Sequence, residues 1–225
     1  MNDHLLRFNH DALFVCADFE GECLNLVTSK PWQFAAVVFK LKKFSKPGES
    51  RIDIVETHDI YIGWENLNVS EDAARITRFD KNKWERLAKD PKEVFEKIQD
   101  IYNKALFIVG HNFLGYDNHI DRNSRISLGL PVLPIHRKIL DTFPLGKGLE
   151  DKLNIPYTPD KDLFQYQMKL YHYLPPQARK RGFSTLGALC KLFNVEYDTQ
   201  KAHDALYDVT VNAEMFANMI HQIDI

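Results

Sequence analysis

The apolar positions near the start of the chain follow the patterns of β-strands. Short apolar runs occupy 12–17 and 33–39, and isoleucines alternate with polar residues through much of 52–62. Such runs and alternation predict three strands. The intervening stretch 40–50 contains Lys-Pro-Gly, a turn signal that suits a hairpin loop. We therefore expect the three strands to form an antiparallel meander.

The pattern then changes to a helix that leads into a buried strand. From Pro91 onward, apolar residues recur every three or four positions, which predicts one apolar helical face. Residues 105–110 follow as a continuous apolar run, typical of a strand covered on both faces. A helix followed by such a strand is typical of α/β sheets. The order indicates that this later strand joins the meander in one α/β sheet.

The last part of the chain is expected to be mostly helical. A helix is predicted over 118–128, a short strand over 139–142, and a further helix after a capping Ser184. The final helix has an apolar stripe at intervals of three and four residues. This stripe consists of Leu206, Val209, Ala213, Phe216 and Ile220. Segment 146–182 lacks a clean period, and we interpret it as an insertion near the functional site.

Composition supports one domain spanning 1–225. The chain has 225 residues with 44% hydrophobic content, enough for a sizeable core. Three cysteines without a CxxC pair argue against a disulfide framework and a structural zinc site. The polar N-terminus and the lack of an apolar run of roughly 18 to 20 residues predict a soluble cytoplasmic protein without a membrane span.

The global charge is close to neutral. A net charge of −2 and an isoelectric point near 6.5 exclude a protein that coats nucleic acid by bulk charge. A local basic groove remains compatible with these values.

The first chemical signal is the pair Asp18 and Glu20, directly after an apolar run. Residues i and i+2 of a strand share a face, so both carboxylates project together and could bind a cation. Asp-x-Glu also occurs on solvated strand edges, and that interpretation stays open.

A second signal follows the predicted strand at 105–110. The stretch 110–117 reads GHNFLGYD and ends in Asp117, where a helix begins. Functional residues concentrate at such carboxyl ends of strands in open α/β sheets. Asp117 could alternatively be a helix cap. His111 fits a structural donor beside the strand end.

The third signal opens the final helix. His203 and Asp204 precede Asp208 in the sequence HDALYD, and Asp208 faces away from the apolar stripe. A solvated acidic helix start would have the same appearance, and Asp204 suits that role.

The order of these signals resembles that of the three exonuclease motifs of the DnaQ-like superfamily in its DEDDh branch. Those motifs are a strand Asp-x-Glu, an Asn…Tyr-Asp after a strand, and a late His-x4-Asp. The resemblance extends to 31–34, 69–77 and the C-terminal helix pair. It implies an RNase H-like α/β fold: a mixed five-stranded sheet, antiparallel meander plus parallel strands, flanked by helices.

The resemblance also implies site roles. Asp18, Glu20, Asp117 and Asp208 would ligate two Mg²⁺ or Mn²⁺ ions, and His203 would be the general base. The implied activity is 3′→5′ hydrolysis of nucleic acid to 5′-mononucleotides. Single-stranded DNA is the favoured substrate, because 110–130 resembles the exonuclease domain attached to B-family DNA polymerases more than the oligoribonuclease group. Hard oxygen ligands suit these ions, and imidazole accepts protons near neutral pH.

Substrate contacts are expected from residues beside the motifs and from the insertion. Gly21 stands where many family members have Thr, which leaves open how the terminal hydroxyl is held. The apolar and aromatic candidates could stack on bases or simply pack. The basic residues of the insertion could contact phosphates or form a solvated surface. The expected set is Gly21, Leu24, Trp32, Asn112, Phe113, Tyr116, Arg179, Lys180 and Arg181.

Two other functions fit the same motifs. One is a 3′→5′ exoribonuclease or oligoribonuclease of the same fold, because the motifs do not distinguish sugars. The other is a catalytically inactive accessory module, which the presence of all five residues disfavours. The expected partner is a nucleic acid with a free 3′ end, with proofreading or another replication or repair role open.

Overall fold

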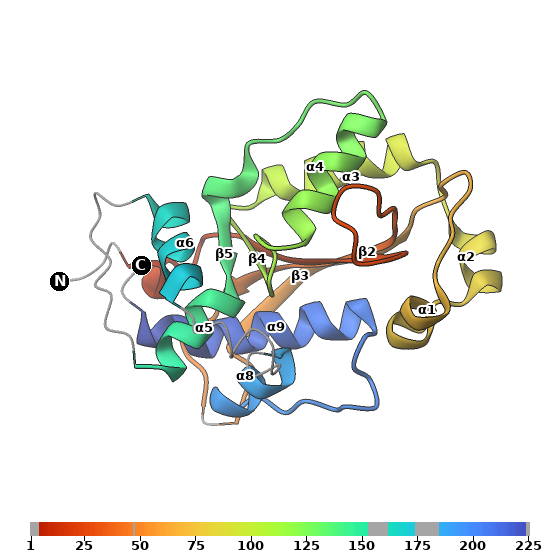
Figure 1. Ribbon diagram of the computed structural model, residues 1–225. Helices are drawn as coiled ribbons and strands as arrows, with labels where there is room; N and C mark the ends of the chain where they lie inside the picture. Colours follow the sequence, from red (N-terminus) through yellow and green to blue (C-terminus); the bar gives the residue numbers. More distant parts are fainter. Residues whose placement is uncertain (1–4, 47, 153–161, 174–184, 224–225) are drawn as a thin grey trace.

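A five-stranded mixed sheet forms the centre of the protein (Figure 1). The computed structural model describes residues 5–46, 48–152, 162–173 and 185–223. The strand order is β3-β2-β1-β4-β5. The first three strands pair antiparallel, and β4 and β5 run parallel to β1. The strands are β1 (Phe14–Gly21), β2 (Pro31–Leu41), β3 (Ile52–Tyr61), β4 (Phe107–Gly110) and β5 (Ile139–Asp141). This confirms the meander joined to parallel strands.

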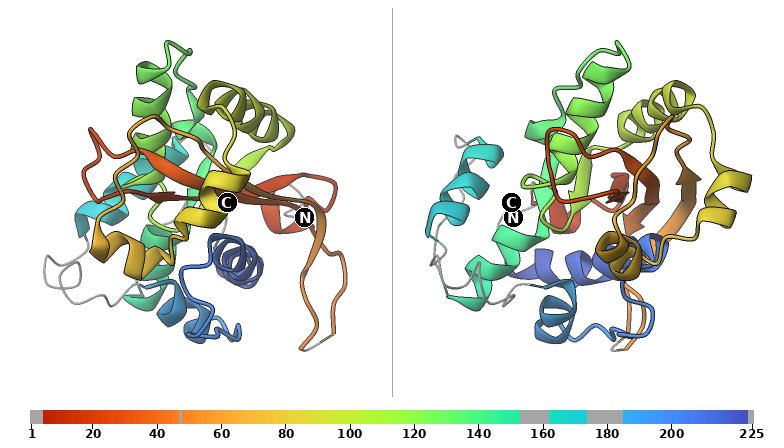
Figure 2. Two further views of the ribbon diagram at one scale, coloured as in Figure 1. Left: turned by 90° about the vertical axis from the view of Figure 1, so that its right-hand side faces the viewer. Right: turned by 45° about the vertical axis from the view of Figure 1, so that its right-hand side comes forward.

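Helices cover both faces of the sheet. In Figure 1, α3 and α4 lie above the sheet and α9 lies below it, with α5 and α8 beside α9. A view turned by 90° shows α9 running under the strands (Figure 2). The longer helices are α3 (Pro91–Lys104), α4 (Asp117–Ser127), α5 (Thr142–Glu150), α6 (Leu163–Tyr173) and α9 (Ala205–Met219). The shorter ones are α1 (Glu71–Thr77), α2 (Lys81–Leu87), α8 (Leu186–Leu192), and the 3₁₀ turns η1 (Leu6–Phe8), η2 (Ile135–Lys138) and η3 (Ile220–Gln222).

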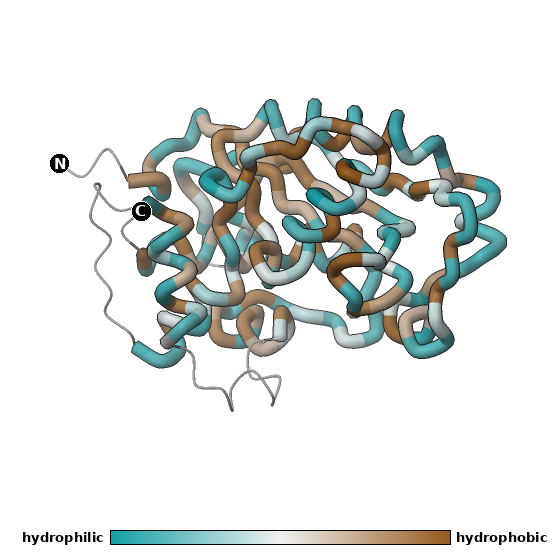
Figure 3. The backbone as a smooth tube through the Cα atoms, turned by 45° about the horizontal axis from the view of Figure 1, so that its top comes forward, coloured by the Kyte–Doolittle hydropathy of each residue, from teal (hydrophilic) through white to brown (hydrophobic). Residues whose placement is uncertain are grey.

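Two apolar clusters fill the space between the sheet and the helices. One joins β1 and β2 side chains to α9, and the other joins the opposite face to α3. Both faces of β2 are therefore buried, so its sequence is almost continuously apolar rather than alternating. Figure 3 shows brown apolar segments in the interior and teal segments around them. No helix among the described residues is long and apolar enough to cross a membrane.

Local sequence signals set several helix boundaries. Asp90 caps α3, with Pro91 in the first turn as expected. Thr185 caps α8 by accepting the Ala188 N–H, and the predicted cap Ser184 lies outside the described residues. The expected insertion 146–182 contains the end of α5 and all of α6. All three cysteines are free thiols.

Candidate active site

The carboxyl end of β1 presents the first two acids. Asp18 and Glu20 both line one cavity, and Phe19 between them packs its ring against Phe34 and Phe95. This agrees with the alternation of side chains along a strand. Glu20 pairs in register with Gln33 of β2, and the register shifts at the next residue. The strand therefore ends directly after the acidic pair.

Asp117 connects the second motif to the first. It is the first residue of α4, and Tyr116, not Asp117, is the N-cap. Its Oδ1 accepts the backbone N–H of Phe19 at 2.8 Å, so the carboxylate is turned toward β1. Asp117 is 2% exposed. The cap alternative for this residue does not hold.

Asp208 enters the site from the first turn of α9. Its Oδ2 accepts the backbone N–H of His203 at 2.9 Å, and its Oδ1 accepts the Tyr197 hydroxyl at 3.2 Å. His203 adopts a left-handed backbone with φ of 63°, a conformation that is costly for a residue with a side chain. Asp204 caps α9 by accepting the Tyr207 N–H, which agrees with its interpretation as an acidic residue at the start of a helix.

Burial raises the pKa values of the acids, and repulsion between them adds to the shifts. Burial raises the pKa of Asp18 from 3.8 to about 7, with repulsion from Asp208 as the second cause. Burial raises the pKa of Glu20, assisted by Asp18, Asp208 and Asp117. Burial and the charge of Asp18 raise the pKa of Asp117. Such mutual repulsion requires proximity, so the fold brings together four acids from three distant segments.

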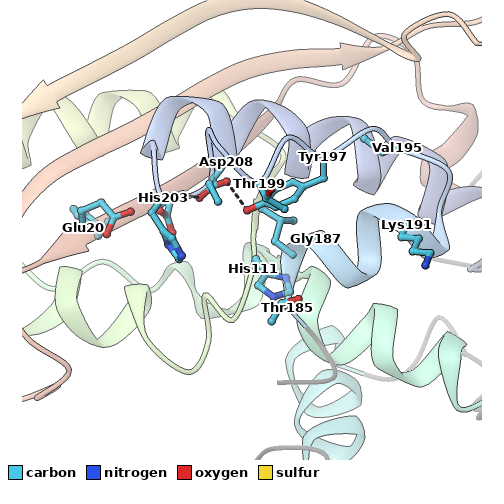
Figure 4. A pocket seen from close by; sticks show the side chains of 14 residues that line it. Glu20, His111, Thr185, Gly187, Lys191, Val195, Tyr197, Thr199, His203 and Asp208 are labelled. Carbon is cyan, nitrogen blue, oxygen red and sulfur yellow. Dashed lines mark hydrogen bonds between the residues drawn. The ribbon is translucent and has the colours of Figure 1, made fainter. Parts of the chain in front are cut away.

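One cavity contains most of this constellation (Figure 4). It has a volume of about 890 Å³ and extends from Asp18 and Glu20 past His203 and Asp208 to Lys191 of α8. His111 lines the same cavity, and its Nδ1 is 3.2 Å from the Thr142 hydroxyl oxygen. Lys191 was not predicted, because a single helical lysine carries no motif.

The donor set fits divalent cations by its chemistry. Within the described residues, no three His, Cys, Asp or Glu side chains adopt the spacing of a formed metal site. Yet four carboxylates lie close together, and in the part of the chain that the structure describes no lysine or arginine is among the groups that shift their pKa values. Buried anions without cationic partners are costly. Hard oxygen ligands around a negative site suit Mg²⁺ or Mn²⁺.

The expected base-contact residues divide into exposed and buried groups. Leu24 is 89% exposed on the loop after β1. Trp32 is 3% exposed beneath Tyr61 and Phe79, and Phe113 is fully buried. The expectation that Trp32 and Phe113 offer ring faces to bases is therefore corrected, because their rings pack inside the protein.

The other expected contacts have mixed positions. The Tyr116 hydroxyl donates to the Cys23 carbonyl at 3.1 Å and lies where a side chain on Gly21 would be. Tyr116 and Gly21 therefore hold the loop that carries Leu24. Asn112 is exposed in a left-handed conformation, with φ of 60°. Arg179, Lys180 and Arg181 lie outside the described residues.

Asp141, at the end of β5, organises the loop before Asp117 and was missed by the sequence analysis. The side chain is fully buried, and burial raises its pKa to about 6. Its Oδ1 accepts the N–H groups of Asn112 and Phe143, and its Oδ2 accepts the Leu114 N–H and the Tyr171 hydroxyl, all within 3.0 Å. This carboxylate thus ties β5 and α6 to the second motif.

We expect Asp141→Asn to lower the free energy of unfolding by about 2–3 kcal/mol, because an amide NH₂ would face buried N–H donors. Urea denaturation measures this loss. Tyr171→Phe is the matched control, since it removes one of the four donors and should cost about 1 kcal/mol. An Asp141→Asn midpoint equal to that of the wild type would contradict the role of this carboxylate.

Comparisons with known proteins agree with this architecture. Residues 15–216 match the model of the exonuclease family RNase_T. No curated protein matches the chain by sequence. Among solved structures, E. coli Exonuclease I in complex with a dT13 oligonucleotide has a TM-score of 0.63 and 18% identity, over 92% of this chain and 40% of that chain.

Two further structures are similar. The zinc-bound form of the E. coli ExoI–ssDNA complex has a TM-score of 0.65 and 17% identity, over 94% of this chain and 41% of that chain. The ExoI/SSB-Ct complex has a TM-score of 0.57 and 15% identity, over 91% and 40%. At these identities the likeness shows the fold. This chain spans about two fifths of the length of those proteins.

Proposed function

The chain belongs to the RNase_T exonuclease family, and from this membership we propose that it is a 3′→5′ exonuclease of the DEDDh branch. It would hydrolyse single-stranded DNA from the 3′ end and release 5′-mononucleotides. The observation that carries this proposal is the convergence of four acids: Asp18, Glu20 and Asp208 line one cavity, and the Asp117 carboxylate accepts the N–H of Phe19 between the first two.

In this proposal Asp18, Glu20, Asp117 and Asp208 hold two Mg²⁺ or Mn²⁺ ions. When bound, the ions lower the pKa of the attacking water and stabilise the leaving oxygen. The imidazole of His203, which lines the same cavity, takes the proton from the attacking water. Its left-handed backbone turns the N–H toward Asp208, so the proton acceptor and a metal-binding acid are adjacent.

Two residues, one outside the cavity and one lining it, support a nucleic-acid substrate. Leu24 is exposed on the loop that follows the acids of β1, where it can contact a terminal base. Lys191 lines the far end of the cavity and can bind a phosphate. The preference for single-stranded DNA is supported by the fold shared with Exonuclease I, whose structures include bound oligonucleotides. A replication or repair role is part of the same proposal.

The test is hydrolysis of matched single-stranded DNA, duplex DNA and RNA, each labelled at the 5′ end. With Mg²⁺ or Mn²⁺ we expect a ladder of products that shorten one nucleotide at a time, fastest on single-stranded DNA. Chelator should abolish the ladder, because the acids would lose their cations. A preference for RNA would indicate the exoribonuclease alternative. No product from any of the substrates would indicate the inactive accessory module.

A further inference from the structure

The segment between α8 and α9 brings Tyr197 into the candidate active site. Tyr197 lines the same cavity as Asp18, His203 and Asp208. Its ring lies against α8 at Gly187, where a Cβ would come within 2.9 Å of two ring carbons. Real Cβ atoms do not approach this closely, so the missing side chain of Gly187 makes room for the ring. Figure 4 shows Tyr197 between Gly187 and Asp208.

The Tyr197 hydroxyl reaches one oxygen of Asp208, and a backbone group holds the other. The hydroxyl donates to Oδ1 at 3.2 Å, and the His203 N–H donates to Oδ2 at 2.9 Å. A carboxylate attached only through its own side-chain bonds could rotate. Two donors on different oxygens fix its plane, and each oxygen keeps a further lone pair for another partner.

We propose that Tyr197 is a positioning residue for the reaction: its hydroxyl, placed by the close approach to Gly187, sets the orientation of the Asp208 carboxylate. The inference rests on the proposed function, because the proposed function makes Asp208 a metal ligand. Supporting groups of this kind are a general requirement for precise metal ligation. The His203 N–H completes the arrangement, so the acid and the neighbouring imidazole are held by the same segment.

Tyr207 provides a matched comparison in the same region. Its hydroxyl accepts the Asp198 N–H at 2.6 Å, and its ring lies 5.8 Å from that of Tyr197. The Tyr207 hydroxyl therefore holds the loop backbone without contacting Asp208. Removing either hydroxyl loosens the segment, but removing that of Tyr197 also frees the carboxylate.

The decisive variants are Tyr197→Phe and Tyr207→Phe. For Tyr197→Phe we expect kcat about tenfold lower, equivalent to about 1.4 kcal/mol, with the KM for the oligonucleotide unchanged. The Mg²⁺ concentration for half-maximal rate should rise, and calorimetric titration of the protein with Mn²⁺ alone should show weaker binding. Tyr207→Phe should keep the wild-type Mn²⁺ affinity and Mg²⁺ requirement, even where its melting temperature falls. Gly187→Ala should shift Mn²⁺ binding in the same direction as Tyr197→Phe.

The outcomes separate this inference from the proposed function. An active wild type with unchanged kcat and Mn²⁺ affinity in Tyr197→Phe overturns the positioning role alone. Equal losses of Mn²⁺ affinity in both phenylalanine variants also overturn it, because loop order would then be the cause. An inactive wild type removes the proposed function, and the Mn²⁺ titrations still decide whether Tyr197 orients Asp208.

Discussion

Replacing Asp18 or Asp208 with Asn should reduce hydrolysis by about a thousandfold or more while the protein stays folded. Each substitution removes one of the four carboxylates that hold the cations in our proposal. Metal ions contribute several kcal/mol to such reactions, and each 1.36 kcal/mol is a factor of ten in rate. The measurement is the initial rate of mononucleotide release from labelled single-stranded DNA at saturating Mg²⁺.

The thermal stability of Asp18→Asn provides an independent check on the burial of the Asp18 carboxylate. The raised pKa of Asp18 means that its ionisation opposes folding, so in chelator the wild type should lose stability as pH rises from about 4 to about 7. Below the unfolded-state pKa the carboxyl is protonated in both states, and the penalty vanishes. Asp18→Asn removes this contribution. Metal-free Asp18→Asn should therefore melt at the same temperature as the wild type or higher at pH 7.

Asp204→Asn is the matched control for loss of charge. Asp204 is an exposed acid near the site, and its side chain caps α9. Asn is an equally good cap, so the helix should be unaffected. We expect near wild-type hydrolysis from this variant. Near wild-type hydrolysis from Asp18→Asn or Asp208→Asn would instead remove the metal assignment.

Replacing His203 should cost roughly 10²- to 10⁴-fold in kcat, the usual contribution of a general base. His203→Asn is preferable to His203→Ala, because Asn tolerates the backbone φ of 63° better than Ala does. The backbone N–H that Asp208 accepts remains in both variants. Binding of Mn²⁺ and of the oligonucleotide should therefore persist.

The pH–rate profile tests the role of His203 directly. At saturating Mg²⁺ the wild-type rate should fall toward acidic pH, because a protonated base cannot accept the proton of the attacking water. The substituted proteins should lack that fall, since no imidazole remains to be protonated at this position. A variant with the wild-type profile would show that another group accepts the proton.

The sequence predicted most of the fold because the burial of a strand or helix face determines the spacing of apolar residues along the chain. The three-and-four spacing in α3 and α9 follows from which side chains face the core, whereas in β3 Ile52 and Ile60 are buried but Ile54 is exposed. Continuous apolar runs at β1 and β4 showed strands covered on both faces. Periodicity did not reveal α1 and α2, which contain no buried residues and therefore carry no apolar stripe.

Aromatic residues beside the motifs were harder to assign. Trp32 and Phe113 stand next to chemically important positions, and their types suit stacking on bases as well as packing. The structure buries both, and Phe113 lies over Gly110, where any Cβ would clash with its ring. Sequence spacing does not distinguish these positions from exposed ones, because their burial depends on which distant segments pack against them.

By itself, the sequence determined the chemical kind of each candidate group and its place at a strand or helix end. Asp18 and Glu20 share a face because strands repeat every two residues, and Asp208 faces away from the apolar stripe of its helix. Only the tertiary structure decided that these acids, Asp117 and the Tyr197 hydroxyl meet in one place. Local periodicity encodes burial, whereas proximity between distant segments depends on how strands order in the sheet and how helices pack against it. The raised pKa values follow from that proximity and burial, so they appear only in the folded protein.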